Sequence, residues 1–251
     1  LREALSRLHS ELSDAAGYIR ARLPPPLPDG GKIAVDWLFV PSLELGGDAF
    51  DYFFVDEHRF VLYLLDVPGH GVGPSLLAIS VLRCLREQGL PEVDLCNPPA
   101  VCQALNQRFS SEAYGGRYFT LFYAVMDLRT RTLRYVQAGH PPALLQSAAT
   151  HQLLTSDRAM MGPVDGLEYQ AAECQVEPGS RLYGFSDGAY EVMSPERTML
   201  PFERFCAELL CAPPAQIPRE RVLSRMLALA QAYHGAQILP DDFSFLAFDF
   251  P

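Results

Sequence analysis

Alternating apolar and polar positions, typical of β-strands, dominate the chain from about residue 32 onward. In the last such run, positions alternate between two faces, which carry Phe243, Phe245, Ala247 and Asp249 on one side and Ser244, Leu246, Phe248 and Phe250 on the other. Nine runs are predicted as strands: 32–40, 49–55, 60–66, 118–127, 133–138, 143–146, 169–176, 181–186 and 243–250. Residues 55–59 and 128–132 read as tight hairpin connections between consecutive strands.

Helical spacing fills the longer gaps between these strands. The predicted helices are 74–88, 99–112, 201–210 and 218–233, and the first of them opens with Pro74 in its first turn. Hairpin strands combined with paired helices predict an α+β fold. We expect a four-layer α-β-β-α sandwich, in which two antiparallel sheets face each other and helices flank them on the outside.

The beginning of the chain has a different pattern. Apolar residues recur there at alternating spacings of four and three, at Leu1, Leu5, Leu8, Leu12, Ala15 and Ile19. This spacing predicts an amphipathic helix of coiled-coil period, which ends at the proline run 24–26. Residues 1–28 are therefore predicted as a linker or signalling helix with a proline-rich turn, able to form a homodimer, and residues 29–251 as the main domain. The alternative is a helix that folds back on its own domain.

Composition narrows the class of protein. The 251 residues are 49% hydrophobic, enough to bury one substantial core. Acidic residues outnumber basic ones by 30 to 20, and no basic stripe is present, so the sequence predicts no nucleic-acid partner. Its apolar runs are too short to span a membrane. No CxxC pair or signal peptide is present, and the chain starts at Leu1, so we expect a cytoplasmic piece of a longer protein with reduced thiols.

Aspartates at four places in the chain carry the candidate chemistry, because each place is a glycine-containing turn or a strand end. They are Asp48 after Gly46-Gly47, Asp66 after an apolar strand, Asp187 before Gly188, and the pair Asp241-Asp242. Glycine beside a strand-end carboxylate leaves its approach open. Taken singly, each also fits an ordinary turn aspartate, and Asp48 in particular fits a turn cap. Carboxylates brought together from four turns would repel one another unless cations lay between them.

The charge sum predicts the kind of metal site. Four carboxylates balance two divalent cations, and the absence of accompanying histidines favours Mn²⁺ or Mg²⁺ over softer metals. Two such ions can hold a water molecule, lower its pKa and direct it at phosphorus. No GxSxG elbow, Cys-x₅-Arg loop or P-loop supplies another route. The sequence therefore predicts metal-dependent phosphate chemistry.

Together these segments resemble a known family. They are GGDAFD at 46–51, DVPGHG at 66–71, FTLFY at 119–123, AGHPP at 138–142, FSDG at 185–188 and DDFS at 241–244. The set closely resembles the bacterial SpoIIE/RsbU-like branch of the metal-dependent PPM protein phosphatases. The match covers roughly residues 14–250 and is weakest over 193–239. Residues 8–19 resemble the linker helix that joins a receiver or sensor domain to the phosphatase in this branch.

The resemblance implies Mn²⁺- or Mg²⁺-dependent hydrolysis of phosphoserine or phosphothreonine on a partner protein, often a STAS-type anti-anti-sigma factor. It implies that Asp66 bridges both metal ions and that the Val67 carbonyl completes one of them. Asp187 and Asp241 would hold the other ion, with Asp48 supporting it directly or through water. We therefore expect Asp66 and Asp187 to be essential for catalysis. Around these ligands, the supporting candidates are Asp51, His70 and Asp242.

Some positions depart from the family pattern. Pro68 stands where a serine is usual, which predicts a stiffer loop after Asp66. His70 lies four residues beyond Asp66 rather than two, so it fits a loop-packing residue as well as a general acid. His140 is interpreted as a structural turn residue. For a phosphate-binding arginine, Arg117 and Arg83 are the available candidates.

Two other functions fit part of the pattern. One is a pseudophosphatase that acts as a regulated protein-interaction module, which the presence of all four aspartates opposes. The other is a two-metal hydrolase of a nucleotide or a small phosphate ester, although such sites usually mix histidine with aspartate. Metal content and turnover would decide the first, and a comparison of phosphoprotein with small esters the second.

Overall fold

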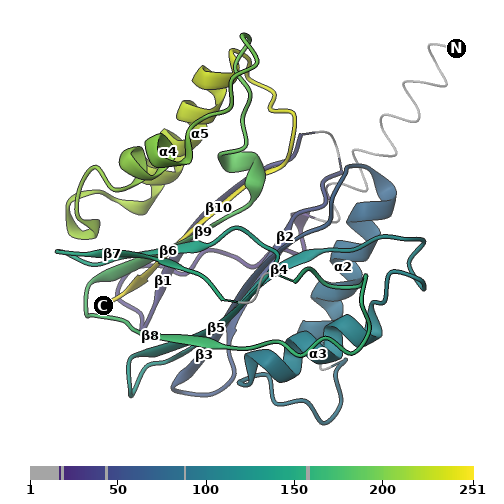
Figure 1. Cartoon of the computed structure of the whole chain (residues 1–251). Helices are drawn as coiled ribbons and strands as arrows, with labels where there is room; N and C mark the ends of the chain where they lie inside the picture. The colour runs from purple at the N-terminus through teal and green to yellow at the C-terminus, as the bar shows by residue number, and fades with distance from the viewer. Residues whose placement is uncertain (1–16, 18–19, 43–44, 88, 157–158) are drawn as a thin grey trace, which may run out of the picture.

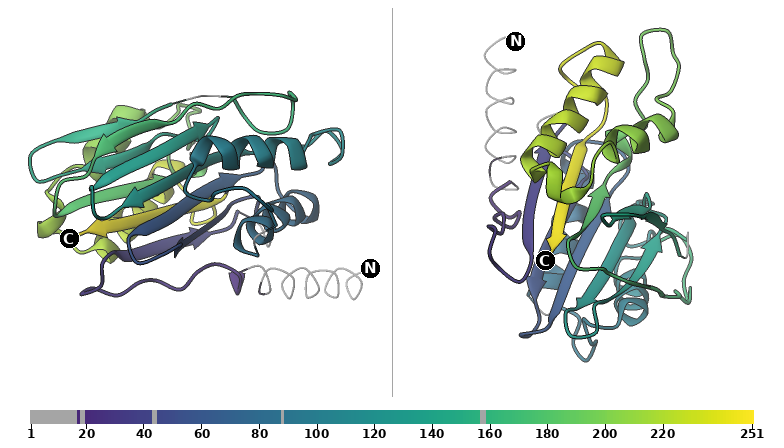
Figure 2. Two further views of the ribbon diagram at one scale, coloured as in Figure 1. Left: turned by 90° about the horizontal axis from the view of Figure 1, so that it is seen from below. Right: turned by 90° about the vertical axis from the view of Figure 1, so that its left-hand side faces the viewer.

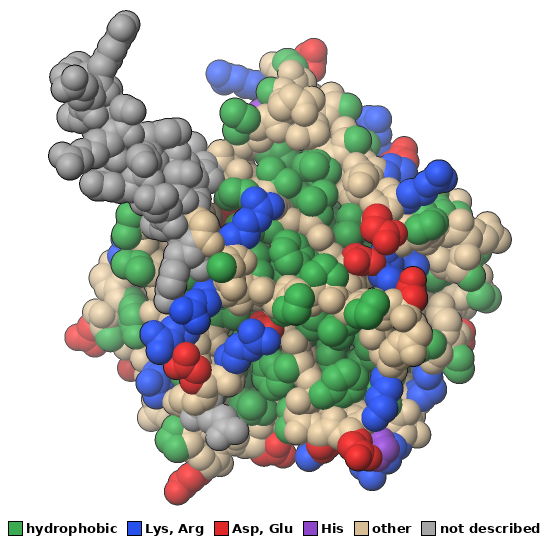
Figure 3. Space-filling model, turned by 180° about the vertical axis from the view of Figure 1, so that it is seen from behind, with side chains coloured by type: hydrophobic (Ala, Val, Ile, Leu, Met, Phe, Trp, Pro, Cys, Tyr) green, Lys and Arg blue, Asp and Glu red, His purple; other side chains and the backbone are tan. Residues whose placement is uncertain are grey.

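The computed structural model describes residues 17, 20–42, 45–87, 89–156 and 159–251. The apolar seam predicted for residues 1–19 lies outside these residues, so the signalling helix and the homodimer stay predictions. Among the described residues, no helix has both the length and the apolar character needed to cross a membrane. On the face seen in Figure 3, hydrophobic side chains form a band across the centre, with charged side chains at its margins.

In the part of the chain that the structure describes, ten strands form two five-stranded sheets, and all pairings between these strands are antiparallel. One sheet has the order β1-β10-β9-β6-β7, with β1 Ala34–Val40, β10 Phe243–Phe250, β9 Ser180–Phe185, β6 Ala143–Gln146 and β7 His151–Leu154. The other has the order β2-β3-β4-β5-β8, with β2 Ala49–Phe54, β3 Arg59–Asp66, β4 Thr120–Asp127, β5 Thr132–Ala138 and β8 Ala172–Gln175.

The helices cover the outer face of each sheet (Figures 1 and 2). Helices α2 Val72–Arg86 and α3 Pro98–Arg108 pack on the β2–β8 sheet, whereas α4 Phe202–Leu209 and α5 Arg219–His234 pack on the other sheet. Two 3₁₀ turns, η1 Asp187–Ala189 and η2 Pro214–Gln216, complete the described elements. The buried side chains form three clusters, one between the sheets and one under each helical layer. These clusters define the four layers of the predicted sandwich, and the fold class is confirmed.

Strand alternation assigns each side chain to its layer. In β3, Val61, Tyr63 and Leu65 face the α2–α3 layer, and the alternate residues face the opposite sheet. In β10 the predicted alternation is confirmed, because Phe243 and Phe245 pack under α4 and α5 while the alternate Leu246, Phe248 and Phe250 pack between the sheets. Strands β3 and β10 therefore each have two buried apolar faces, as the inner layers of a four-layer fold require.

The nine predicted strands and four predicted helices are all present, with ends displaced by a few residues. Strand β7 was not predicted. It is four residues long, it forms the edge of its sheet, and its first three residues are exposed. A short exposed edge strand has no apolar alternation, so the periodicity of the sequence carries no signal for it.

Candidate metal centre

The predicted aspartates lie at one end of the sandwich because of the strand register. Asp66 ends β3, and Asp48 directly precedes β2, whose first residue pairs with Leu65. In the other sheet, Asp187 follows β9 and Asp241 precedes β10, and β9 and β10 are antiparallel neighbours. In each antiparallel pair, the end of one strand lies beside the start of the next. Each sheet thus contributes aspartates to the same end of the sandwich.

The pKa shifts show that these carboxylates interact. Burial, followed by the charges of Asp187 and Asp241, raises the pKa of Asp66 to about 8. Burial and the charge of Asp241 raise the pKa of Asp187 to about 6. For Asp48, burial and the charge of Asp66 hold the pKa well above its usual range. Burial is the largest influence on all three groups, and the charges that act on them most strongly are those of other carboxylates.

This arrangement fits hard divalent cations. The donors are carboxylate oxygens together with the Val67 carbonyl, and oxygen ligands are those that Mn²⁺ and Mg²⁺ prefer. Within the described residues, no three His, Cys, Asp or Glu side chains are already grouped as a finished metal cage. The carboxylates are therefore neighbours that repel one another, and bound cations would draw them together. Asp48, Asp66, Asp187 and Asp241, with the Val67 carbonyl, are the residues that would hold such ions.

The glycines of the 46–51 segment are required by close contacts. A methyl group on Gly47 would overlap the carbonyl oxygen of Val67, and one on Gly46 would overlap the carboxylate of Asp242. The Gly47 carbonyl also accepts a hydrogen bond from Val67 N at 3.2 Å. The start of β2 and the loop after β3 can approach this closely only because these positions carry no side chain.

Gly47→Ala is expected to displace the Val67 carbonyl and to weaken Mn²⁺ binding at least about ten-fold, with a loss of about 1–3 kcal/mol of stability from overpacking. Titration calorimetry and urea unfolding of the purified variant measure the two effects. Gly184→Ala is the matched control, because the nearest atom to its added methyl group, Leu64 Cδ2, is at 3.9 Å. Equal Mn²⁺ affinity for Gly47→Ala and wild type would contradict the proposed role of Val67.

Asp242 organises the loops around the candidate centre. The carboxylate is 3% exposed and accepts hydrogen bonds from Ser42 N at 2.8 Å, Ser42 Oγ at 3.1 Å and Gly47 N at 2.7 Å. Ser244 Oγ, on β10, donates to Asp48 Oδ2 at 2.6 Å. The supporting role expected of Asp242 therefore has a physical basis, since its acceptors satisfy buried donors from a distant part of the chain.

The other candidates occupy distinct positions. Asp51 is fully buried on β2, where its Oδ2 pairs with Arg86 Nε of α2 at 2.9 Å, and burial raises its pKa to about 6. The ion pair joins β2 to α2, and the supporting role of Asp51 at the candidate centre stays a prediction. His70 is exposed, and its charge partly offsets the effect of burial, which raises the pKa of Asp241. His70 therefore lies near the candidate centre, and both of its predicted roles stay open.

The two arginines that are candidates for binding phosphate lie in different places. Arg83 Nη2 pairs with Glu87 on the exposed side of α2 at 3.0 Å. The Arg117 guanidinium lies against Gly73 in the first turn of α2, directly after the 66–71 loop. Of the two, Arg117 is the one next to the loop that carries Asp66.

A cavity of about 400 Å³ adjoins the candidate centre. Its lining includes Asp66 and Asp187, together with Thr120, His140 and Glu191. The contact between His140 and Thr120, and the serines that bond Asp48 and Asp242, were not predicted as parts of the site. Ser186 Oγ also donates to the backbone carbonyl of Asp242 at 3.1 Å. Ser186 and Ser244 lie inside the FSDG and DDFS segments, so their proximity to the aspartates was visible in the sequence, but their hydrogen bonds were not.

The fold and the carboxylate-lined strand ends define the class of PPM, or PP2C-type, metal-dependent phosphatases. Residues 56–251 match the family described as stage II sporulation protein E (SpoIIE), and the chain belongs to this family. The family resemblance seen in the sequence is thereby confirmed. Relatives of this chain are named as phosphoserine phosphatases, and phosphatases of the PPM family generally depend on metal ions.

Two curated relatives come from Bacillus subtilis strain 168. The phosphoserine phosphatase RsbP is 29% identical over 222 residues, which cover 87% of this chain and 52% of RsbP. The phosphoserine phosphatase RsbU is 25% identical over 193 residues, which cover 76% of this chain and 56% of RsbU. The chain thus spans about half the length of these relatives.

Solved structures share the fold. The SiaA-PP2C domain of Pseudomonas aeruginosa superposes with a TM-score of 0.81 at 20% identity, with all of both chains covered. The phosphatase domain of SpoIIE from Bacillus subtilis, solved with a regulatory fragment, gives a TM-score of 0.73 at 13% identity, and covers 90% of this chain and 64% of that one. At these identities the likeness concerns the fold alone.

Proposed function

We propose that this chain hydrolyses phosphoserine or phosphothreonine on a partner protein. The observation that carries the proposal is the set of mutually repelling, partly buried carboxylates beside a cavity of about 400 Å³. In proteins, carboxylates grouped in this way usually bind divalent cations, and such cations attract the phosphate group of a substrate. The names of RsbP and RsbU, both phosphoserine phosphatases, support the same reaction.

Two Mn²⁺ or Mg²⁺ ions are proposed as the cofactors. When bound, they would supply charge neutralisation for the phosphate and an activated water nucleophile. Asp66 would hold both ions, as the family resemblance implies, and the charges of Asp187, Asp241 and Asp242 all act on it. Asp187 and Asp241 would be further ligands.

The neighbouring side chains would orient these ligands. Ser244 fixes one carboxylate oxygen of Asp48, and Asp242 holds the backbone of the 46–51 segment through Gly47 N. The cavity beside Asp66 and Asp187 would receive the phosphorylated segment of the substrate. Glu191 on its wall would disfavour acidic residues next to the phosphorylated side chain.

The partner is proposed as a phosphorylated protein of the STAS type. The proposal also includes an upstream receiver or sensor domain on the same chain and a homodimer formed through residues 1–28. RsbP and RsbU are about twice as long as the part of them that this chain matches. Their length supports the proposal that proteins of this kind have further domains.

The substrate class is tested by comparing phosphate release from a phosphoserine protein and from small phosphate esters at matched concentration with Mn²⁺. We expect the phosphoserine protein to give the higher kcat/KM. A preference for a nucleotide or small ester would overturn the protein-phosphatase proposal. Metal binding without turnover on any substrate would instead support a pseudophosphatase.

The pH dependence of stability provides a prediction about the metal-free protein. The pKa of Asp66 is raised to about 8 in the folded state, so its stabilising contribution is present at low pH and is lost as pH rises through about 8. Burial lowers the pKa of His140 to about 3, which reduces stability only below its unfolded pKa of about 6.5. We therefore expect the melting temperature in EDTA to fall from pH 6.5 to 8.5.

Thermal scans with and without Mn²⁺ measure this effect. The Mn²⁺-induced rise in melting temperature should grow over the same pH interval, because bound cations remove the repulsion that opposes ionisation. An EDTA melting temperature that rises from pH 6.5 to 8.5 would contradict the assignment of Asp66 as a carboxylate under repulsion.

A further inference from the structure

His140 lies where the chain crosses from one sheet to the other. Strand β5, in the β2–β8 sheet, ends at Ala138, and β6, in the opposite sheet, begins at Ala143. The side chain of His140 is 2% exposed, and the residue lines the same cavity as Asp66 and Asp187. A buried imidazole at this crossing can contact the ends of strands from both sheets.

On one side, His140 contacts the strand that pairs with the Asp66 strand. His140 Nδ1 lies 2.9 Å from Thr120 Oγ1, within hydrogen-bond distance. Thr120 is the first residue of β4 and stands directly opposite Asp66 in the β3–β4 register. A bond that fixes Thr120 therefore also restrains the strand end that carries Asp66.

On the other side, His140 approaches the strand that leads to Asp187. The Phe185 carbonyl, two residues before Asp187, lies close enough to the ring to raise the pKa of His140 against the larger effect of burial. Nε2 itself has no partner of regular hydrogen-bond geometry in the described chain. The ring thus stands between the Asp66 and Asp187 strand ends.

The backbone holds the ring in this place. Gln137 Nε2 donates to the His140 carbonyl at 2.5 Å, and Gln137 Oε1 accepts from Ser156 N at 3.2 Å. Gly139 has a φ of 70°, which a side chain would strain, and it pairs with Leu121 next to Thr120.

We infer that His140 is a positioning residue of the metal centre, which restrains the strand end that carries Asp66 through its contact with Thr120 and which borders the cavity shared by Asp66 and Asp187. The inference rests on the proposed function, because it assumes that these aspartates are metal ligands. His140 acts through them and is not assigned any contact with the substrate. Partners that orient metal ligands typically change metal affinity 10–100-fold when they are removed.

The test measures Mn²⁺ affinity of the metal-free chain by electron paramagnetic resonance, with no substrate present. His140→Ala and Thr120→Val should each weaken binding about ten-fold, and the double variant should lose little more than either alone. His140→Asn and Thr120→Ser, which retain a group able to form the bond, should bind within about three-fold of wild type. Thr155→Val is the control, since Thr155 lines the same cavity without bonding His140.

Unchanged affinity in Thr120→Val and His140→Ala, or losses that simply add, would overturn the inference. If His140→Ala fails to fold, Thr120→Val and Thr120→Ser remain, and equal Mn²⁺ affinity for these two variants would overturn the inference. Wild type that binds Mn²⁺ but releases no phosphate from phosphoserine would overturn the proposed function while leaving His140 as a positioning residue. Wild type that binds no Mn²⁺ would overturn both.

Discussion

Asp66→Asn is expected to lower kcat on a phosphoserine protein by at least about 10²–10³-fold, the scale of removing one essential electrostatic group. The substitution keeps the shape of the side chain and removes the charge that is proposed to bridge both ions. Asp187→Asn should have a comparable effect, because Asp187 exerts the largest charge effect on the pKa of Asp66. Steady-state kinetics with saturating Mn²⁺ measure both losses.

Asp66→Asn should also be more stable than wild type when metal is absent. At pH 8 the folded protein must ionise Asp66 against burial and three neighbouring carboxylates, and asparagine removes that cost. A higher melting temperature in EDTA combined with lost activity would show that the loss is not due to misfolding. Asp165→Asn is the control, because Asp165 is exposed and distant in sequence from every candidate ligand. Retained activity in Asp66→Asn would exclude Asp66 from the metal site.

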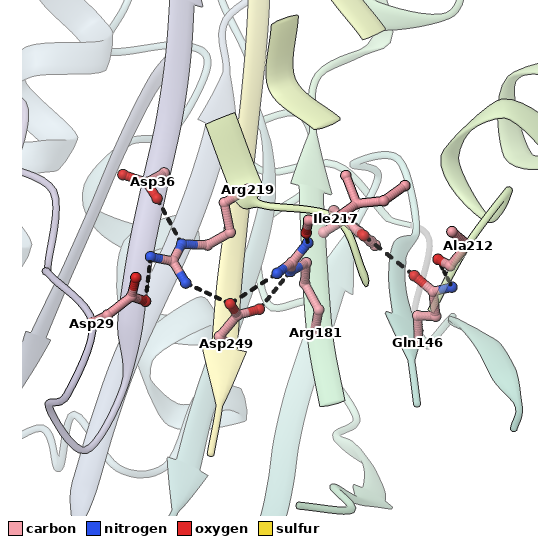
Figure 4. A network of polar contacts seen from close by, with 9 residues as sticks. Asp29, Asp36, Gln146, Arg181, Ala212, Ile217, Arg219 and Asp249 are labelled. Atoms are coloured by element: carbon pink, nitrogen blue, oxygen red, sulfur yellow. Dashed lines mark hydrogen bonds and ion pairs between the residues drawn. The ribbon is translucent and has the colours of Figure 1, made fainter. Parts of the chain in front are cut away.

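Arg219→Met is expected to destabilise the fold by about 3–5 kcal/mol, because it removes the centre of a buried ion-pair cluster. Arg219 is 7% exposed and bonds three aspartates, with Nε to Asp36 at 2.6 Å, Nη1 to Asp249 at 2.5 Å and Nη2 to Asp29 at 2.8 Å. Arg181 binds the same Asp249 carboxylate, so α5, β1, β10 and β9 meet in one network (Figure 4).

The effect should come from the aspartates left without their cation. Asp36 and Asp249 have only 20% and 24% exposed side chains, whereas Asp29 is 84% exposed and adds little. Urea unfolding measures the loss, and Arg221→Met, an exposed position on the same helix, should change stability by less than about 0.5 kcal/mol. A loss below about 1 kcal/mol for Arg219→Met would show that the cluster is not a stabilising network.

The network should leave catalysis intact. Asp249 lies near the end of β10, whereas Asp241 and Asp242 precede its first residue. At about 3.3 Å per residue, this separates the network from the candidate centre by more than about 20 Å. Arg219→Met that remains folded should therefore keep the wild-type KM for Mn²⁺.

The layers of the fold were predictable because its strands are buried on both faces. Alternation in β10 assigned its two sets of side chains correctly, and the helices were visible from apolar spacing between strand runs. Helix α3 ends at Arg108 rather than at residue 112, where the chain turns so that Ser111 N can donate to Gly162 O. Long-range bonds of this kind, like the exposed edge of β7, leave no periodic signal in the sequence.

The candidate site was predictable only in part. Glycine-flanked aspartates at strand ends indicated which residues would converge, because the ends of neighbouring strands and the loops after them lie together at one end of a sheet. The hydrogen bonds of Asp242 join residues about 200 positions apart, and no local pattern encodes them. His140 was interpreted as a turn residue, and its place between Thr120 and the Phe185 backbone depends on how the chain crosses between the sheets.

The central claim is that metal ions held by these carboxylates hydrolyse a phosphorylated side chain. Its most direct test is one titration in which Mn²⁺ is added to the metal-free chain while bound metal and phosphate released from a phosphoserine protein are measured together. We predict that activity appears as two Mn²⁺ ions bind per chain and disappears on chelation. Phosphate release that continues at full rate in EDTA would contradict the claim.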